Sequence, residues 1–245
     1  MENKNKKHFI ITGVLFFLFM IFTIVVTKVD VKPIGPEQSL VGLASLNQFM
    51  LELFGVNLLW YAITDYLGIL CILFAFGFSI LGLCQLIKRK SLFKVDYSIL
   101  LLGVFYVLVV FVYLFFEFVI INYRPIILET SLEASYPSSH AMIIVCIMGT
   151  AILQFHRLFY KKKVLLIVMD SISIFLIIIT VVGRLISGVH WFTDIVAGII
   201  LSSALIMLYY STVYYIKEKY FVLSETACHE KNTEKTENKE QKELV

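Results

Sequence analysis

Cysteine is scarce in this sequence and follows no pattern that a metal site or a disulfide framework requires. Its four cysteines lie in apolar runs or in the polar C-terminal tail, at Cys71, Cys84, Cys146 and Cys228. No pair has the spacing of zinc ligands. We therefore expect small buried side chains at these positions. Neither a disulfide, a bound metal nor another cofactor is predicted.

A continuous basic face is also missing. The net charge is +3, but the lysines occur in short clusters between apolar runs. Nucleic-acid binding needs basic residues gathered on one surface, so no nucleic-acid partner is predicted.

Polar residues are also few. Apolar residues make up 59% of the chain and the mean hydropathy is +0.86, which is too hydrophobic for a soluble domain. Six runs are long enough to cross a bilayer as helices. They lie at about 9–27, 58–87, 98–123, 139–160, 164–184 and 193–216. We predict an all-α polytopic membrane protein with six transmembrane helices in a domain of residues 1–222.

Three further segments are interpreted from their patterns. The first run is too long for a signal-peptide core and is expected to be a retained helix. In the connection 28–57, Ser45, Gln48 and Glu52 recur at helical spacing opposite apolar residues, which predicts an interfacial amphipathic helix. Residues 223–245 have almost nothing to bury and predict a disordered cytoplasmic tail.

The distribution of basic residues predicts the orientation, because cytoplasmic segments near spans are rich in Lys and Arg. Three lie at the start, four each in 88–97 and 156–163, and six after the last span. We therefore expect both termini in the cytoplasm and the connections 28–57, 122–138 and 184–192 outside. Arg124 and Arg184 are exceptions on the positive-poor side, which suggests that they bind something.

Two outward segments carry residues suited to phosphate chemistry. Arg184, His190 and Asp194 lie between two apolar runs, where an uncompensated charge is costly and is usually kept for a function. If a helix begins here, the four-residue spacing lets Asp194 contact and orient the His190 ring. The alternative is that Arg184 and His190 are interfacial residues that reach toward headgroups.

The other segment has Arg124-Pro125 at the end of the third run and Pro137-Ser138-Ser139-His140 at the start of the fourth. A Pro-Ser-Ser sequence suits a helix start, whose free N–H groups attract anions. Arginine matches a phosphate with two parallel hydrogen bonds. Two arginines, two histidines and a helix N-terminus together predict a phosphate site.

These motifs resemble the type 2 phosphatidic acid phosphatase family, which includes membrane lipid phosphatases. The family's first motif consists of Lys, six further residues and Arg-Pro. It matches here at Arg124-Pro125. Its Pro-Ser-Gly-His matches at 137–140. The family's third motif consists of Ser-Arg, five further residues, His, three further residues and Asp. It matches here at Arg184, His190 and Asp194. The order, spacing and shared membrane side agree over a frame of about residues 9–216.

The sequence departs from the family at three motif positions. Glu117 stands where the family has its lysine, Ser139 where it has glycine, and Gly183 where it has serine. Serine keeps the backbone N–H and is tolerated if the local backbone angles are ordinary. Glutamate reverses a charge beside a phosphate. We expect Glu117 to be a site modulator that pairs with and orients Arg124 or Arg184.

The resemblance implies a role for each matched residue. His190 would attack phosphorus and form a phosphohistidine, with Asp194 orienting its ring, while His140 would protonate the leaving oxygen and then activate water. The phosphoryl oxygens would be held by Arg124, Arg184 and the N–H groups of Ser138 and Ser139, without a metal. The implied substrate is a lipid phosphate or diphosphate at the outer membrane face, with undecaprenyl diphosphate as the leading candidate in a bacterium; phosphatidylglycerol phosphate, phosphatidic acid and lysophospholipids stay open.

Two other functions are compatible with the same residues. A phosphotransferase would use the same phosphohistidine, and a catalytically silent protein would only bind phospholipid headgroups. Outside the motifs, Asp65 lies in an apolar run, where hydrogen bonding between helices is the favoured interpretation. Glu133 is interpreted as loop surface. Tyr136 and Trp191 fit an aromatic interface belt.

Overall fold

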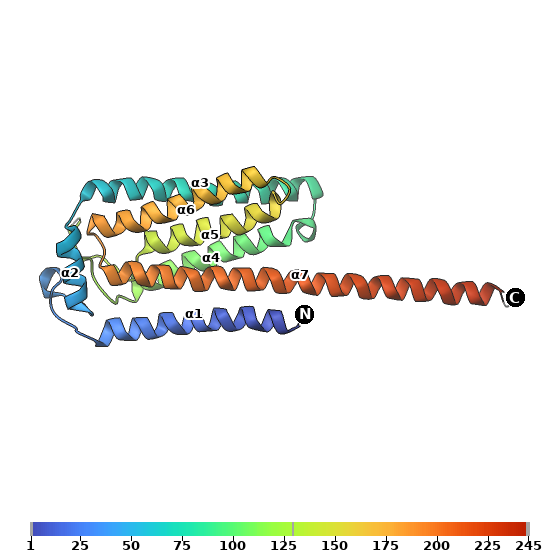
Figure 1. Cartoon of the computed structure of the whole chain (residues 1–245). Coiled ribbons are helices and arrows are strands. Elements are labelled where there is room, and N and C mark those ends of the chain that lie inside the picture. The colour runs from blue at the N-terminus through green and yellow to red at the C-terminus, as the bar shows by residue number, and fades with distance from the viewer. Residues whose placement is uncertain (1, 129, 244–245) are drawn as a thin grey trace.

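The computed structural model describes residues 2–128 and 130–243, and the side chains of residues 5–128 and 130–219. The described part of the chain is helical (Figure 1). The helices are α1 (Glu2–Lys28), α2 (Ala44–Phe54), α3 (Leu58–Arg89), α4 (Tyr97–Phe118), α5 (Ser139–Leu158), α6 (Lys163–Ser187) and α7 (Phe192–Glu243), with short 3-10 turns at Pro36–Gln38 and Leu92–Lys94.

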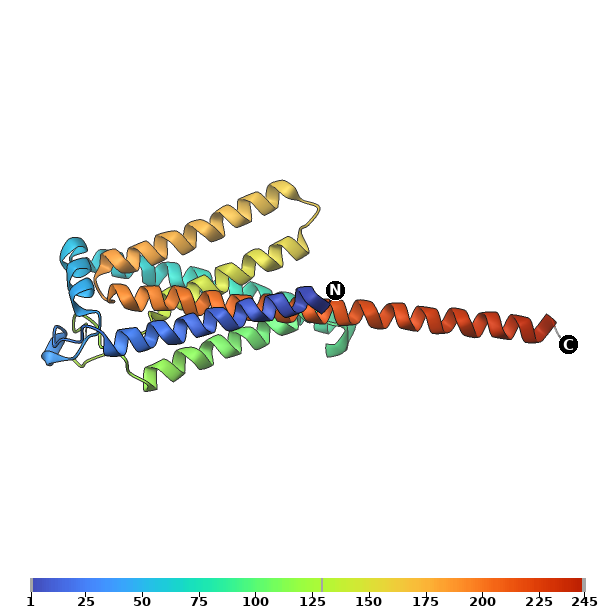
Figure 2. The ribbon, with the colours of Figure 1, turned by 60° about the horizontal axis from the view of Figure 1, so that its bottom comes forward.

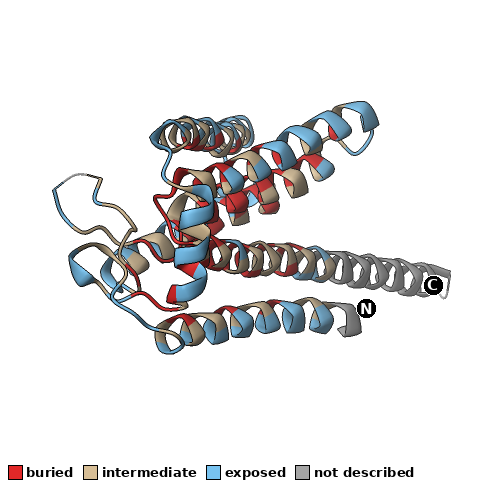
Figure 3. Cartoon of the chain, turned by 60° about the vertical axis from the view of Figure 1, so that its left-hand side comes forward, coloured by how far each residue is buried: buried red, intermediate tan, exposed pale blue. Residues whose placement is uncertain are grey.

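Six of these helices are long and apolar enough to cross a membrane, which confirms the predicted six-span all-α class. Helices α5 and α7 form the centre. In their most apolar windows 56% of the residues are buried by protein, against 17–22% in the other four spans. Figure 3 shows α1 exposed along most of its length. It packs mainly on α7, beside which it runs in Figure 2. The outer helices therefore face lipid and the two central ones carry the core.

The predicted amphipathic helix is present as α2, which lies across one end of the bundle (Figure 1). Its buried Asn47 exchanges two hydrogen bonds with Thr193 at the start of α7: the amide donates to the hydroxyl at 2.9 Å, and the amide oxygen accepts from the backbone N–H at 3.1 Å. Thus α2 fixes where α7 begins, next to the segment that carries His190.

The third span is shorter than predicted. The hydropathy pattern extended it to residue 123, but α4 ends at Phe118. Backbone hydrogen bonds join Arg124 to Glu133 and Ser135 to Asn122 in place of helical ones, with an isolated bridge between Tyr123 and Ala134. Pro125 also disfavours a helical conformation at Arg124, the residue before it. Arg124 is therefore held on a paired loop.

Helix α6 ends at Ser187 and the chain turns through Gly188, whose φ is +65°. A Cβ there would lie 2.4 Å from the Gly55 carbonyl oxygen, so both the backbone angle and the space require glycine. The turn brings His190 to the junction of α6 and α7.

The first turn of α1 and the last turns of α7 lie away from α2 (Figure 1). The N-terminus of α1 and the emerging part of α7 are on the same side of the bundle. Helix α7 continues to Glu243. The side chains of the predicted tail, residues 223–245, lie outside the described residues, and its disorder stays a prediction.

The aromatic-belt interpretation was wrong for both residues to which it was applied. Tyr136 and Trp191 are 1% and 2% exposed, respectively. The Trp191 indole donates to the Tyr123 carbonyl at 2.8 Å, and the Tyr136 hydroxyl lies 2.7 Å from that of Thr23. The polar groups of both side chains form hydrogen bonds inside the protein, so neither side chain has to lie at the membrane interface to satisfy them.

Candidate functional site

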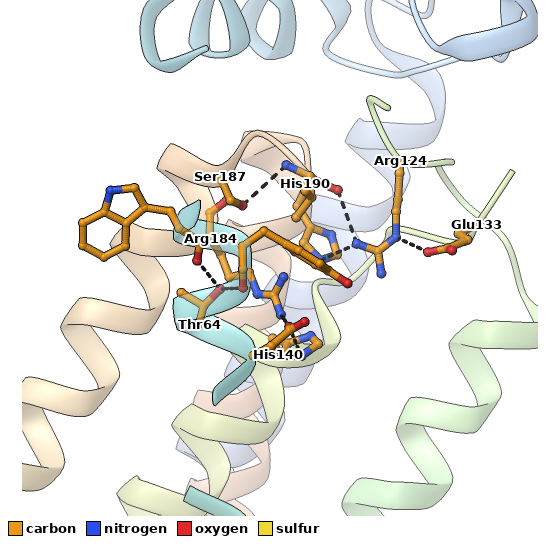
Figure 4. Close-up of polar contacts among 11 residues, drawn as sticks. Thr64, Arg124, Glu133, His140, Arg184, Ser187 and His190 are labelled. Atoms are coloured by element: carbon orange, nitrogen blue, oxygen red, sulfur yellow. Dashed lines mark hydrogen bonds and ion pairs between the residues drawn. The ribbon is translucent and has the colours of Figure 1, made fainter. Parts of the chain in front are cut away.

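The structure brings the predicted residues together at the α2 end of the bundle. Arg124 comes from the loop after α4, His140 from the first turn of α5, Arg184 from the last turn of α6, and His190 from the turn before α7. Figure 4 shows their side chains in one cluster. Segments far apart in sequence thus converge on a single site, as the motifs predicted.

The His190 ring is 3% exposed and contacts different groups through its two nitrogens. Nδ1 lies 3.0 Å from the Ser135 hydroxyl and 3.2 Å from the Ser135 carbonyl oxygen. Nε2 lies 3.4 Å from Nη1 of Arg124, which has hydrogens to donate and no lone pair. Nδ1 therefore carries the ring proton, and Nε2 keeps the lone pair that a nucleophile needs. Burial, with Arg124 and Arg184 nearby, holds the pKa of His190 well below its usual value, so the ring is neutral.

Asp194 does not contact the His190 ring directly, contrary to the expectation from helical spacing. Its Oδ2 accepts from the Ser135 hydroxyl at 2.5 Å and from the Trp191 N–H at 3.0 Å, and its Oδ1 accepts from Asn122 at 3.1 Å. Helix α7 starts at Phe192, so His190 precedes the helix and the four-residue spacing does not place the two side chains on one helical face.

Arg184 is fully buried and is held by Asp65 of α3, to which its Nη2 donates. Its guanidinium also lies over the Tyr61 ring, 4.9 Å from the centroid. The same carboxylate oxygen of Asp65 lies 3.0 Å from Nε2 of His140. Asp65 therefore links Arg184 of α6 to His140 of α5. The expected hydrogen bonding between helices is present, and it connects two predicted site residues.

Arg124 is anchored by a different carboxylate. Its Nε lies 2.7 Å from Glu133, across the paired loop, while Nη1 approaches the Val189 carbonyl at 3.5 Å. Glu133 is therefore more than the loop surface that its position suggested. It directs the other edge of the guanidinium toward His190 (Figure 4).

Several buried polar atoms of the site have no hydrogen-bond partner among the described residues. They are Nε of Arg124, Nε and Nη1 of Arg184, Nδ1 of His140 and Oγ of Ser138. Nε of Arg124 lies close to Glu133 in an ion pair, but without hydrogen-bond geometry. A buried donor without a partner costs about 1–3 kcal/mol, and more if it is charged. The guanidinium nitrogens among these atoms are donors, and in one cluster with a neutral imidazole (Figure 4) they are suited to an anion with several oxygens.

The start of α5 provides fewer backbone donors than expected. The N–H of Ser138 donates to the Asp194 carbonyl at 2.9 Å and is not free, so its predicted role in holding a phosphoryl oxygen was wrong. The Ser138 side chain makes no capping hydrogen bond. The N–H of Ser139, in the first helical turn, therefore stays available for an anion.

Comparison with known proteins identifies the family. Residues 70–218 match the sequence profile of the PAP2 superfamily. The chain belongs to this superfamily. The family resemblance of the three motifs is thereby confirmed. The fold is similar to that in the crystal structure of the first transmembrane PAP2 type phosphatidylglycerolphosphate phosphatase from Bacillus subtilis, with a TM-score of 0.57 and 18% identity over 85% of this chain and 96% of that one. No curated protein matches the chain.

Two departures from the PAP2 motifs have a local explanation. Ser139 is the first residue of α5 and has no positive φ, so its ordinary backbone angles accept serine in place of glycine. At Gly183, a Cβ would lie 2.6 Å from Thr64 Cγ2 and 3.0 Å from the Trp60 ring. Glycine at the serine position therefore lets α6 approach α3 closely, and this approach carries Arg184 to Asp65.

The third departure, Glu117, does not have the expected partner. We predicted an ion pair with Arg124 or Arg184, but the structure pairs these arginines with Glu133 and Asp65. The prediction assumed a helix that continues to Arg124, whereas α4 ends at Phe118. Glu117 is exposed and lines a small cavity. The cavity is bounded by Tyr113, Phe116, Glu117, Ala134, Ser135, Tyr136, Pro137, Ser139, Met142 and His190.

Sequence reasoning assigned no site role to three residues that hold the PAP2 motif residues in place: Asp65, Glu133 and Ser135. Asp65 lies outside the matched range 70–218. One signal was available, because an acid near the end of an apolar run is a suitable partner for an otherwise unpaired arginine near the same end of the bundle. Nothing comparable marked Ser135, one of many serines in the sequence.

Proposed function

We propose that this PAP2 protein is a lipid phosphatase that acts through a phosphohistidine. Nε2 of His190 would attack phosphorus as the bond to the lipid oxygen breaks. His140 would protonate that oxygen, then take a proton from the water that cleaves the phosphorus–nitrogen bond and releases phosphate. Each step uses only side chains of the cluster.

One observation carries this proposal: buried guanidinium donors of Arg184 without a partner lie in the same cluster as a neutral histidine whose Nε2 keeps its lone pair (Figure 4). A phosphoryl group beside Nε2 of His190 would give Nε and Nη1 of Arg184 the acceptors that they lack. Arg124 and the N–H of Ser139 would take the remaining oxygens. Donors already fixed in a dry site stabilise the charge that redistributes in the transition state, so we propose that no metal is required.

His140 is suited to the acid–base role by its contact with Asp65. The carboxylate binds Nε2, 3.0 Å away, so Nδ1 is the atom left to give or take a proton. Asp65 would keep the ring oriented through both steps. Because Asp65 also binds Arg184, the phosphate-holding arginine and the proton donor would keep a fixed relative position.

The substrate class follows from the membrane frame and the phosphate chemistry. We propose a lipid phosphate or diphosphate that reaches the site at the outer face of the membrane. Undecaprenyl diphosphate stays the leading candidate for a bacterial cell. The similar solved structure is that of a phosphatidylglycerolphosphate phosphatase, which makes this lipid the second candidate. Phosphatidic acid and lysophospholipids complete the class.

An assay on the purified full chain in detergent tests the function. Each candidate lipid is supplied with a chelator present, and released phosphate is measured with and without an added alcohol acceptor. We expect phosphate release from at least one lipid, unaffected by chelator. Group transfer to the alcohol without hydrolysis would favour a phosphotransferase. Lipid binding without either reaction would favour a headgroup-binding protein.

The orientation predicts which positions an impermeant thiol reagent reaches in intact cells. The connection between α4 and α5, which contains Ser131, and the connection between α5 and α6, which contains Lys162, lie at opposite ends of α5. We expect Ser131→Cys to be labelled and Lys162→Cys to be labelled only after lysis, in a background without the native cysteines. The reverse pattern would place the site on the cytoplasmic face and direct the search to inner-leaflet lipids.

Glu117→Gln is expected to improve substrate affinity, because it removes a negative charge from the cavity that His190 also lines. We expect KM to fall about three- to tenfold, more for a diphosphate than for a monophosphate, since like charges in a partly dry site repel. Glu133→Gln is the matched control. It weakens the ion pair of Arg124 and should lower kcat/KM. If both variants lose activity alike, Glu117 supports the site instead of opposing the substrate.

A further inference from the structure

Ser135 lies between His190 and Asp194, the last two residues of the third PAP2 motif. Its hydroxyl donates to Asp194 Oδ2 at 2.5 Å and lies 3.0 Å from Nδ1 of His190. The side chain is 2% exposed, and its backbone N–H donates to the Asn122 carbonyl at 2.9 Å. It therefore has a fixed place inside the loop that pairs with residues 122–124.

The direction of the two hydrogen bonds is determined by chemistry. A hydroxyl has one proton, and a carboxylate has none to give, so the Ser135 proton points to Asp194. The Ser135 oxygen is then an acceptor toward His190, whose Nδ1 carries a hydrogen. The resulting chain runs from the ring N–H through the hydroxyl to the carboxylate.

We propose that Ser135 is a positioning residue through which Asp194 acts on the nucleophile. When Nε2 bonds to phosphorus, the ring becomes cationic. The Ser135 oxygen, polarised by the carboxylate, then receives a stronger hydrogen bond from Nδ1 and stabilises that charge. The Ser135 carbonyl, 3.2 Å from Nδ1, fixes the tautomer by itself. The hydroxyl adds the link to Asp194. The kinetic consequence of this inference rests on the proposed function. The hydrogen-bonded link from His190 through Ser135 to Asp194 does not.

The kinetic test compares Ser135→Ala with Ser135→Thr in the full chain. Loss of a hydrogen bond that ends on a charged group should lower kcat about 10- to 100-fold. Affinity for inorganic phosphate, measured as product inhibition, should change less than about twofold, since the arginines that hold it are unaffected. Threonine keeps the hydroxyl and should recover most of kcat. Ser202→Ala is the control, because Ser202 is a buried serine whose hydroxyl bonds only within α7.

A double-mutant cycle distinguishes the link from a general weakening of the fold. If Asp194 acts through Ser135, Asp194→Asn should lower kcat strongly in the parent and little further in Ser135→Ala. Additive losses, or equal losses of kcat in Ser135→Ala and Ser202→Ala, would overturn the proposal. So would a Ser135→Ala protein with the parent kcat.

A spectroscopic cycle makes the test independent of turnover. In protein with 15N-labelled histidine, the His190 ring signals are identified by their absence in His190→Ala. Asp194→Asn should shift them in the parent but not in Ser135→Ala. A shift of equal size in both backgrounds would show that Asp194 acts without Ser135. An inactive parent that still shows the coupled shifts would reject the phosphatase function and leave the link intact.

Discussion

Replacing His190 by alanine is expected to abolish phosphate release, lowering kcat by about 10³-fold or more, because the proposed phosphohistidine can then no longer form. We do not expect His140 to substitute for it, because the proposed mechanism uses the unpartnered Nδ1 of His140 for proton transfer. In a rapid quench with labelled lipid phosphate, the parent should show acid-labile phosphate on the protein. His190→Ala should show none.

The matched control for this variant is His156→Ala. His156 lies near the opposite end of α5, is exposed, and contacts Asp170 at 2.7 Å. It should keep the parent rate. Membrane yield and the thermal midpoint should be similar for both variants, because His190 lies in a turn between spans and its loss removes no helix contact. A His190→Ala protein with substantial phosphatase activity would overturn the nucleophile assignment.

Arg184→Lys is expected to lower kcat/KM by about 10²-fold or more, although the charge is kept. Lysine can still pair with Asp65, but it has no counterpart to Nε and Nη1, the two buried donors left for a phosphate. The loss should appear in both kcat and the affinity for inorganic phosphate. Phosphate release and product inhibition measure the two effects separately.

The chain has an unusually close control for this substitution in Arg157. Like Arg184, it pairs with an aspartate, Asp96 at 3.8 Å, and lies over a tyrosine ring, Tyr97, at 4.9 Å. Arg157 belongs to the other end of the bundle, near the C-terminus of α5. Arg157→Lys should therefore report the structural cost alone, with kcat/KM near the parent value. If the two variants lose activity equally, Arg184 is a structural anchor and does not hold the phosphate.

The spans and the amphipathic helix could be predicted because hydropathy and helical periodicity are local properties. A run of about twenty apolar residues must satisfy its backbone groups within itself in lipid, so it forms a helix whatever its neighbours are. The motif residues Arg124, His140, Arg184 and His190 were found for a related reason. Their types and spacing remain visible in the sequence before any packing is known.

The partners of those residues depended on packing. Asp65 reaches Arg184 only because Gly183 lets α6 approach α3, and Ser135 lies between Asp194 and His190 only because its loop pairs with residues 122–124. Glu117 was assigned to an arginine that another carboxylate holds, and the Ser138 N–H was counted as free although a distant carbonyl accepts it. The sequence by itself determined the number of spans, the family and the candidate site residues. The tertiary structure decided which groups are satisfied and which remain for a substrate, because hydrogen bonds between segments 50 or more residues apart follow from helix packing and not from local pattern.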